Sequence, residues 1–73
     1  MSRDWVHTVH KEGNWVVEIE GHGVTSVHRN KDEAVSVGRE LAIARRTEHV
    51  IHNLDGTIAG RNSYGNDPFP PAG

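Results

Sequence analysis

Six histidines in a chain of 73 residues are the side chains best suited to chemistry near neutral pH. They are His7, His10, His22, His28, His49 and His52. Two pairs, His7 with His10 and His49 with His52, have a spacing of three, which clusters side chains on a helix but points them to opposite faces of a strand. Both pairs lie in segments of strand character, so each is a poor chelator. Because the chain also lacks Cys, His-x-His and HExxH patterns, we expect no metal and no other cofactor, with an intermolecular site through His22 or His28 as the alternative.

Serine nucleophiles are the second chemical possibility. Ser26 lies two residues before His28, and Ser63 could pair with one of the Asp residues, but neither pattern has the context of a known nucleophile motif. A domain this small also has little depth for a ligand pocket, which usually measures ~300–1,000 Å³. We therefore expect a protein that is not an enzyme.

The charge balance limits the possible partners. Eight Lys and Arg against ten Asp and Glu give a net charge of −2, which lacks the basic excess of most nucleic-acid binders. Arg39, Arg45 and Arg46 on a predicted helix are the possible nucleic-acid contacts, although acidic residues are interleaved with them. Protonation of the histidines would make the net charge positive, so partner binding could depend on pH.

Absent features restrict the class of protein further. Without Cys there are no disulfides and no thiolate chemistry. The N-terminal residues contain no apolar stretch typical of a signal peptide, and no segment approaches the ~20 apolar residues of a membrane span. We expect a cytoplasmic protein that does not enter the membrane.

Two segments rich in Val and Trp, residues 5–10 and 14–20, predict a β-hairpin. A three-residue loop with Gly13 in the left-handed conformation would pair His10 with Asn14. This register gathers one apolar face for a helix to cover: Trp5, Val9, Trp15, Val17 and Ile19. Residues 24–28 could add a short extended piece after the hairpin.

An amphipathic helix is predicted to start after Asn30, with Glu33 at the capping-box position. Its apolar stripe consists of Ala34, Val37, Gly38, Leu41 and Ala42. Glycine on that stripe indicates a close approach between the helix and the sheet. Arg45 and Arg46 fall where the helix should end and complement its dipole. Ile43 points away from the stripe as an isolated exposed residue or a dimer contact.

The remaining segments complete an α+β fold. Residues 48–53 and 57–61 predict a second hairpin, in which Ile51 and Ile58 share a face if the connection has four residues. The expected architecture is ββαββ: a two-layer sandwich with a four-stranded, mainly antiparallel sheet and one helix on one face. Residues 1–62 form the domain and residues 63–73 an extended Pro-rich tail. A thin core favours further burial in a homodimer.

The tail is the most distinctive part of the sequence. Residues 63–71, Ser-Tyr-Gly-Asn-Asp-Pro-Phe-Pro-Pro, resemble the C-terminal signature of a small bacterial family, domain of unknown function 2188. Trp15, the Val27-His28 approach to the helix, the helix itself and the Asp55-Gly56 turn agree with this resemblance. It implies a compact α+β unit from a bacterium or phage and brings no activity, ligand or catalytic residue.

A preformed Pro-rich segment loses little conformational entropy when it docks. The tail residues expected to contact a partner are Tyr64, Asn66, Asp67, Pro68, Phe69 and Pro70. Their target is the tail's own domain, a second subunit or another protein, and we favour docking on the fold. The sequence thus predicts a non-enzymatic binding or assembly module, with a nucleic-acid-binding accessory protein as the alternative.

Overall fold

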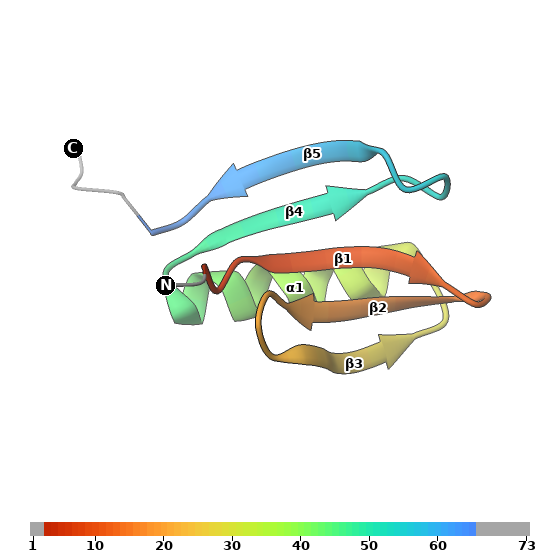
Figure 1. Ribbon diagram of the computed structural model, residues 1–73, viewed down its shortest axis with the longest axis horizontal. Helices are drawn as coiled ribbons and strands as arrows, with labels where there is room; N and C mark the ends of the chain where they lie inside the picture. Colours follow the sequence, from red (N-terminus) through yellow and green to blue (C-terminus); the bar gives the residue numbers. More distant parts are fainter. Residues whose placement is uncertain (1–2, 66–73) are drawn as a thin grey trace.

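A five-stranded mixed sheet with one helix on one face forms the fold (Figure 1). The computed structural model describes residues 3–65. Its elements are β1 (Val6–Lys11), β2 (Asn14–Ile19), β3 (Gly23–His28), α1 (Lys31–Arg45), β4 (Glu48–His52) and β5 (Ile58–Ser63). The strand order is β3-β2-β1-β4-β5. The α+β class with one helix is confirmed, whereas the predicted four-stranded sheet is wrong because residues 23–28 form a full strand.

One strand pair, β1 with β4, is parallel, and the other three pairs are antiparallel. The two turns of the β1-β2-β3 meander leave β3 pointing in the same direction as β1. Helix α1 then carries the chain back across the sheet, so β4 starts from the same end as β1. Such a crossover is what joins parallel strands. It creates a parallel seam in the middle of the sheet that the hairpin patterns alone did not predict.

The first hairpin has a two-residue turn, so its predicted register was wrong by one residue on β1. Glu12 and Gly13 both have positive φ, 52° and 86°, as a type I′ turn requires, and Lys11 pairs with Asn14. The prediction had reserved the left-handed conformation for Gly13 alone. Because side chains alternate along a strand, the shift moves every β1 side chain to the other face.

The helix-facing side of the hairpin therefore carries Val6 and Thr8 from β1 instead of Trp5 and Val9. Both are fully buried. The β2 half of the prediction is confirmed: Val17 and Ile19 are buried, and Trp15 packs against the core. The core cluster consists of Val6, Val17, Ile19, Ala34 and Ala42, with Trp15, Val37, Leu41 and Tyr64 packed around it.

Helix α1 follows its predicted pattern closely. The Asn30 side chain caps the N-terminus by accepting the Glu33 backbone N–H at 2.8 Å. Ala34, Gly38 and Ala42 are the buried residues of the stripe. The last helical residue is Arg45, and Arg46 ends the helix in the left-handed conformation. No helix in residues 3–65 is long and apolar enough to cross a membrane.

A buried polar pair lies under the helix. His49 on β4 and Thr8 on β1 are both fully buried, and Thr8 Oγ1 lies 2.8 Å from His49 Nε2. Burial lowers the pKa of His49 to about 4, with smaller contributions from the charges of Arg39 and His7. The ring is therefore neutral at physiological pH. A Cβ on Gly38 would lie 2.6 Å from His49 Nε2, which explains the glycine on the stripe.

The second hairpin also differs from its prediction. A register shift after Ile51 pairs Ile51 with Gly60 and His52 with Ile58. Ile58 is 58% exposed, while Ile51 is half-buried, so the two do not share a buried face. The bulge is the physical reason, because an extra residue on one strand changes which side chains lie opposite each other.

Candidate functional site

The sheet face opposite α1 is not covered by any element in residues 3–65 (Figure 1). The corrected register places Trp5, His7 and Val9 at positions that point to this side, which we call the open face. Trp5 is thus outside the helix-covered core in which the sequence analysis had placed it. Its indole is instead approached by two guanidinium groups, that of Arg3 at 3.9 Å and that of Arg61 at 5.4 Å from the ring centroid.

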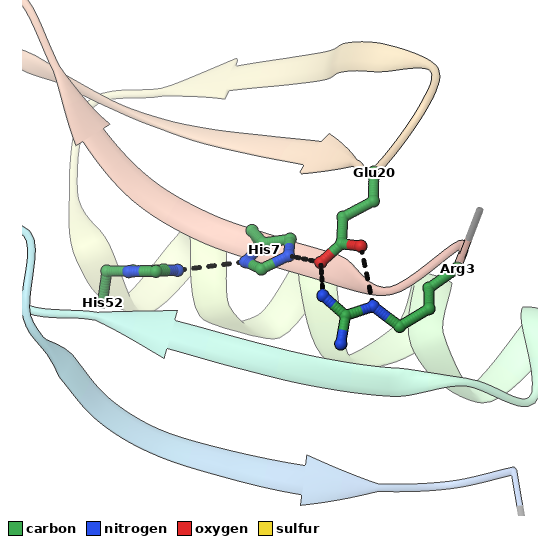
Figure 2. A network of polar contacts seen from close by, with 4 residues as sticks. All are labelled: Arg3, His7, Glu20 and His52. Atoms are coloured by element: carbon green, nitrogen blue, oxygen red, sulfur yellow. Dashed lines mark hydrogen bonds and ion pairs between the residues drawn. The ribbon is translucent and has the colours of Figure 1, made fainter.

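A chain of four polar side chains crosses the open face (Figure 2). His52 Nε2 lies 3.0 Å from His7 Nδ1, and His7 Nε2 lies 2.6 Å from Glu20 Oε2. Arg3 donates from Nε to Glu20 Oε1 at 3.1 Å and from Nη2 to Oε2 at 3.3 Å. We call Arg3, Glu20, His7 and His52 the open-face network. It joins the N-terminal segment, the end of β2, β1 and β4.

The parallel seam brings the two histidines together. His7 on β1 pairs with Val50 on β4, so His52 is its diagonal neighbour on the same face. His52 Nδ1 lies 3.3 Å from the Gly56 carbonyl oxygen of the β4–β5 turn. Each imidazole therefore contacts an acceptor on its outer nitrogen and the other imidazole on its inner nitrogen. Both rings are half-buried, which partly shields these contacts from water.

Glu20 carries the negative charge of the network. Its pKa is held below the ordinary range of a carboxyl, chiefly by the hydrogen bond with His7 and also by the Arg3 guanidinium. Desolvation opposes this shift but is outweighed. Glu20 therefore stays ionised near neutral pH, and it can only accept hydrogen bonds from its two neighbours.

An open hollow of about 490 Å³ adjoins the network. Its lining residues are His7, Val9, Glu18, Ile19, Glu20, Gly21, His22, Gly23 and His52. Within residues 3–65 no three His, Asp or Glu side chains are arranged to hold a metal ion. The lining side chains of the hollow include imidazoles and carboxylates but no hydroxyl or amine, so they can exchange protons and form hydrogen bonds.

The serine candidate Ser26 does contact a histidine. Ser26 Oγ lies 2.9 Å from His28 Nε2, and His28 Nδ1 lies 3.5 Å from Glu33 Oε2. This is the order of groups in a nucleophile, base and carboxylate triad. However, 3.5 Å is too long for a hydrogen bond that fixes an imidazole, and the Glu33 side chain is 58% exposed. The contact satisfies His28 beside the helix start and does not make a case for catalysis.

The three predicted nucleic-acid residues do not join the open-face network. All three are exposed on or after α1, on the other side of the sheet from that network. Arg45 forms an ion pair with Asp4 at 3.3 Å, and Arg46 is the helix C-cap. Trp5 and Trp15 are the aromatic rings on which bases could stack. Each already has a cation over its face, Arg3 at 3.9 Å from the Trp5 centroid and Lys31 at 5.3 Å from the Trp15 centroid. A nucleic-acid role for Arg39, Arg45 and Arg46 stays a prediction.

Only the first of the predicted tail contacts is described. Tyr64 is half-buried against the core cluster, and its backbone N–H donates to the Thr47 carbonyl at 3.2 Å. Gly65 approaches the Arg46 carbonyl so closely that a Cβ would clash. The other predicted contacts, Asn66, Asp67, Pro68, Phe69 and Pro70, lie outside the described residues. The predicted boundary between the domain and the tail, after residue 62, stays a prediction.

The open-face network was missed from the sequence. His7 and His52 are 45 residues apart, and only the parallel β1–β4 pairing makes them neighbours. The sequence signal for this contact is weak, because it consists only of two histidines in segments that predict strands. Finding the pair would have required both the correct hairpin register and the parallel crossover.

Comparisons with known proteins agree with the resemblance in the sequence. Residues 6–64 match a family described as an uncharacterized protein conserved in bacteria, domain of unknown function 2188. Neither a curated protein nor a solved structure matches the chain. The matched region spans all five strands and the helix. The chain therefore belongs to the bacterial family of domain of unknown function 2188.

Proposed function

We propose that this protein is a non-enzymatic binding and assembly module whose open face contacts a second copy of the same chain. The observation that carries the proposal is the composition of that face, where exposed apolar side chains lie beside charges that are already paired. A small domain gains buried area by such an association.

The exposed apolar side chains of the open face lie on its two outer strands. Val24 and Val27 on β3 are 52% and 58% exposed, and Ile58 on β5 is 58% exposed. Val27 pairs with Val16, whose side chain points to the same face. Scattered exposed apolar residues are ordinary, but a sheet face that carries several of them and has no cover is typical of an interface.

The charged part favours a self-complementary contact. Three ion pairs lie within the open face: Arg3 with Glu20 at 3.1 Å, Lys11 with Glu18 at 3.3 Å and Arg61 with Glu48 at 3.1 Å. In a two-fold symmetric dimer the same patch lies on both sides of the interface. Because each of these three cations is neutralised by its own neighbour, the three pairs add little like-charge repulsion between two copies. A phosphate backbone, in contrast, needs cations that are available to it.

Sedimentation velocity tests the proposal. We expect the full chain to form dimers at micromolar concentrations, and Val27→Lys or Ile58→Lys to give monomers because a buried unpaired ammonium is costly. The matched control is Ile43→Lys on the outer side of α1, where the side chain is 50% exposed, and this variant should still dimerise. A monomeric wild type, or dissociation by Ile43→Lys alone, would contradict the proposal.

A parallel measurement tests the nucleic-acid alternative. A short DNA or RNA duplex is titrated into the protein at low salt, and binding is followed by fluorescence anisotropy. The assembly proposal predicts no saturable binding. Salt-sensitive binding that is weakened when Arg39, Arg45 and Arg46 are replaced by Gln would overturn it in favour of a nucleic-acid accessory protein.

A further inference from the structure

We propose that His7 and His52 hold one proton between them, and that the number of protons on this pair controls association through the open face. The second part rests on the proposed function, whereas the first part stands on the geometry of the network alone. The pair lies on the parallel seam between β1 and β4, in the middle of the five-stranded sheet.

The outer nitrogens of the two rings both lie next to hydrogen-bond acceptors. His7 Nε2 lies 2.6 Å from a Glu20 carboxylate oxygen, and His52 Nδ1 lies 3.3 Å from the Gly56 carbonyl oxygen. An ionised carboxylate and a backbone carbonyl can only accept hydrogen bonds. Both outer contacts are made only when each ring donates outward, and two neutral rings that do so each have a lone pair on the inner nitrogen.

The inner nitrogens, His7 Nδ1 and His52 Nε2, are 3.0 Å apart. Two lone pairs at that distance repel each other, whereas one added proton turns the contact into a charge-assisted hydrogen bond of ordinary length. Every contact of both rings is satisfied only when the pair has three N–H groups. This state is one imidazolium and one imidazole that share a hydrogen bond.

The ring orientation favours a proton over a metal ion between the rings. The two ring centroids are 5.3 Å apart, and the two inner nitrogens are 3.0 Å apart. The difference is about twice the distance from a ring nitrogen to the centre of its own ring. The two nitrogens therefore lie near the line that joins the ring centres. A chelated metal would instead require both lone pairs to converge on a point beside that line.

The surrounding charges are compatible with one positive charge on the pair. Glu20 contacts His7 and is itself bound by Arg3. The elements around the pair carry other charged and titratable groups. Glu18 and His22 line the hollow, and Asp55 lies in the β4–β5 turn. His49 is on the opposite face of β4, and Glu48 and Arg61 form an ion pair between β4 and β5. Among the carboxylates of the described residues, only that of Glu20 contacts the ring of His7 or His52.

A change in either direction removes contacts of the pair. A second proton puts two N–H donors face to face, and loss of the shared proton either leaves two lone pairs face to face or requires the His52 tautomer that no longer donates to the Gly56 carbonyl. Either change weakens the contacts that connect β1, β4 and the β4–β5 turn on the open face. Association through this face should therefore be strongest where the pair holds one proton, and it should weaken on both the acid and the alkaline side.

Side-chain ¹⁵N NMR of the full chain tests the proton count directly, because nitrogen shifts distinguish imidazolium from each neutral tautomer. Near neutral pH we expect one shared proton on the His7–His52 pair, while exposed His22 serves as an internal reference. In His52→Gln the amide can donate to His7 Nδ1, so His7 should need no extra proton and become neutral at the same pH. Two neutral rings in the wild type, or titration of both rings in parallel with His22, would overturn the proposal.

Sedimentation velocity across the same pH range tests the regulatory part. A bell-shaped dimer fraction in the wild type that becomes flat in His52→Gln supports it. A dimer fraction that is independent of pH, with the shared proton present, overturns the regulation and leaves the proposed function standing. Monomers at every pH overturn the proposed function, while the NMR result still decides the proton assignment. Displacement of the proton by added zinc would overturn the assignment in favour of a metal site.

Discussion

Gly38 lies against the buried imidazole of His49, with room for a hydrogen atom but not for a methyl group. A Cβ at residue 38 would lie 2.6 Å from His49 Nε2 and 2.7 Å from Thr8 Oγ1. Helix α1 can therefore approach the β1–β4 seam only because its central contact residue has no side chain. The same contact isolates His49 from water, which is why its ring is neutral.

Gly38→Ala should destabilise the protein even though alanine is the better helix former by ~1 kcal/mol. The added methyl group would force the helix or the His49–Thr8 pair to move, which typically costs ~1–3 kcal/mol. Urea unfolding measures the difference. The double variant Gly38→Ala with His49→Ala is the control, because it removes the clashing ring. If Gly38→Ala costs the same with and without His49, the contact with the His49 ring is not the reason for the glycine.

The stability of the protein should fall on acidification because of His49. Its pKa in the folded state is lowered to about 4 from the ordinary 6.5, so between these values the unfolded chain binds a proton that the folded chain does not. This contribution is complete above the unfolded value and is lost as the pH falls toward 4. Its upper limit is about 3 kcal/mol.

Free energies of unfolding at a series of pH values measure this loss in the wild type and in His49→Gln. The glutamine variant keeps a polar group near Thr8 but cannot titrate, so its stability should depend less on pH between about 6.5 and about 4. Parallel pH profiles for the two proteins would show that His49 is not the group responsible.

Glu12→Asn should stabilise the first hairpin. Glu12 adopts φ 52° in the two-residue turn, and Asn-Gly is the preferred sequence for a type I′ turn. The expected gain is about 0.5–1 kcal/mol, because asparagine tolerates the left-handed conformation better than glutamate. Thermal unfolding measures the change, with Glu12→Val as the opposite control. A gain from valine would contradict the two-residue turn.

Removal of residues 66–73 tests the predicted role of the Pro-rich tail. If the tail docks on its own fold or on a second subunit, the truncated chain should melt at a lower temperature or lose its dimer. Tyr64→Ala is the companion variant, since Tyr64 packs against the core cluster and its loss should lower stability by about 2–4 kcal/mol. A truncated chain with unchanged melting temperature and oligomeric state would contradict docking of the tail on its own fold or on a second subunit.

The local rules in the sequence predicted local structure well. The Asn30 cap, the buried stripe of α1 and the helix end at Arg45 were all recognisable from residue type and spacing. The glycine on the stripe correctly indicated a close approach, although its contact residue could not be named. These features depend on residues within a few positions of each other.

The open-face network required non-local information. A glutamate with positive φ, such as Glu12, is uncommon, so residue type favours a three-residue loop and places Trp5 and Val9 on the wrong face. The pairing of His7 with His52 then depended on a parallel crossover that hairpin patterns do not encode. Both errors arise where pairing over a long range overrides local preference.

The most direct test of the open face as an interface is an isotope-filtered NOE experiment on a mixture of ¹³C-labelled and unlabelled full-length chains. Only contacts between two copies give signals in this spectrum. We predict NOEs from the Val24, Val27 and Ile58 methyl groups to protons of the open face of the other copy. NOEs from Ile43 on α1 instead, or no signals between copies at concentrations where the protein is dimeric by sedimentation, would contradict the account.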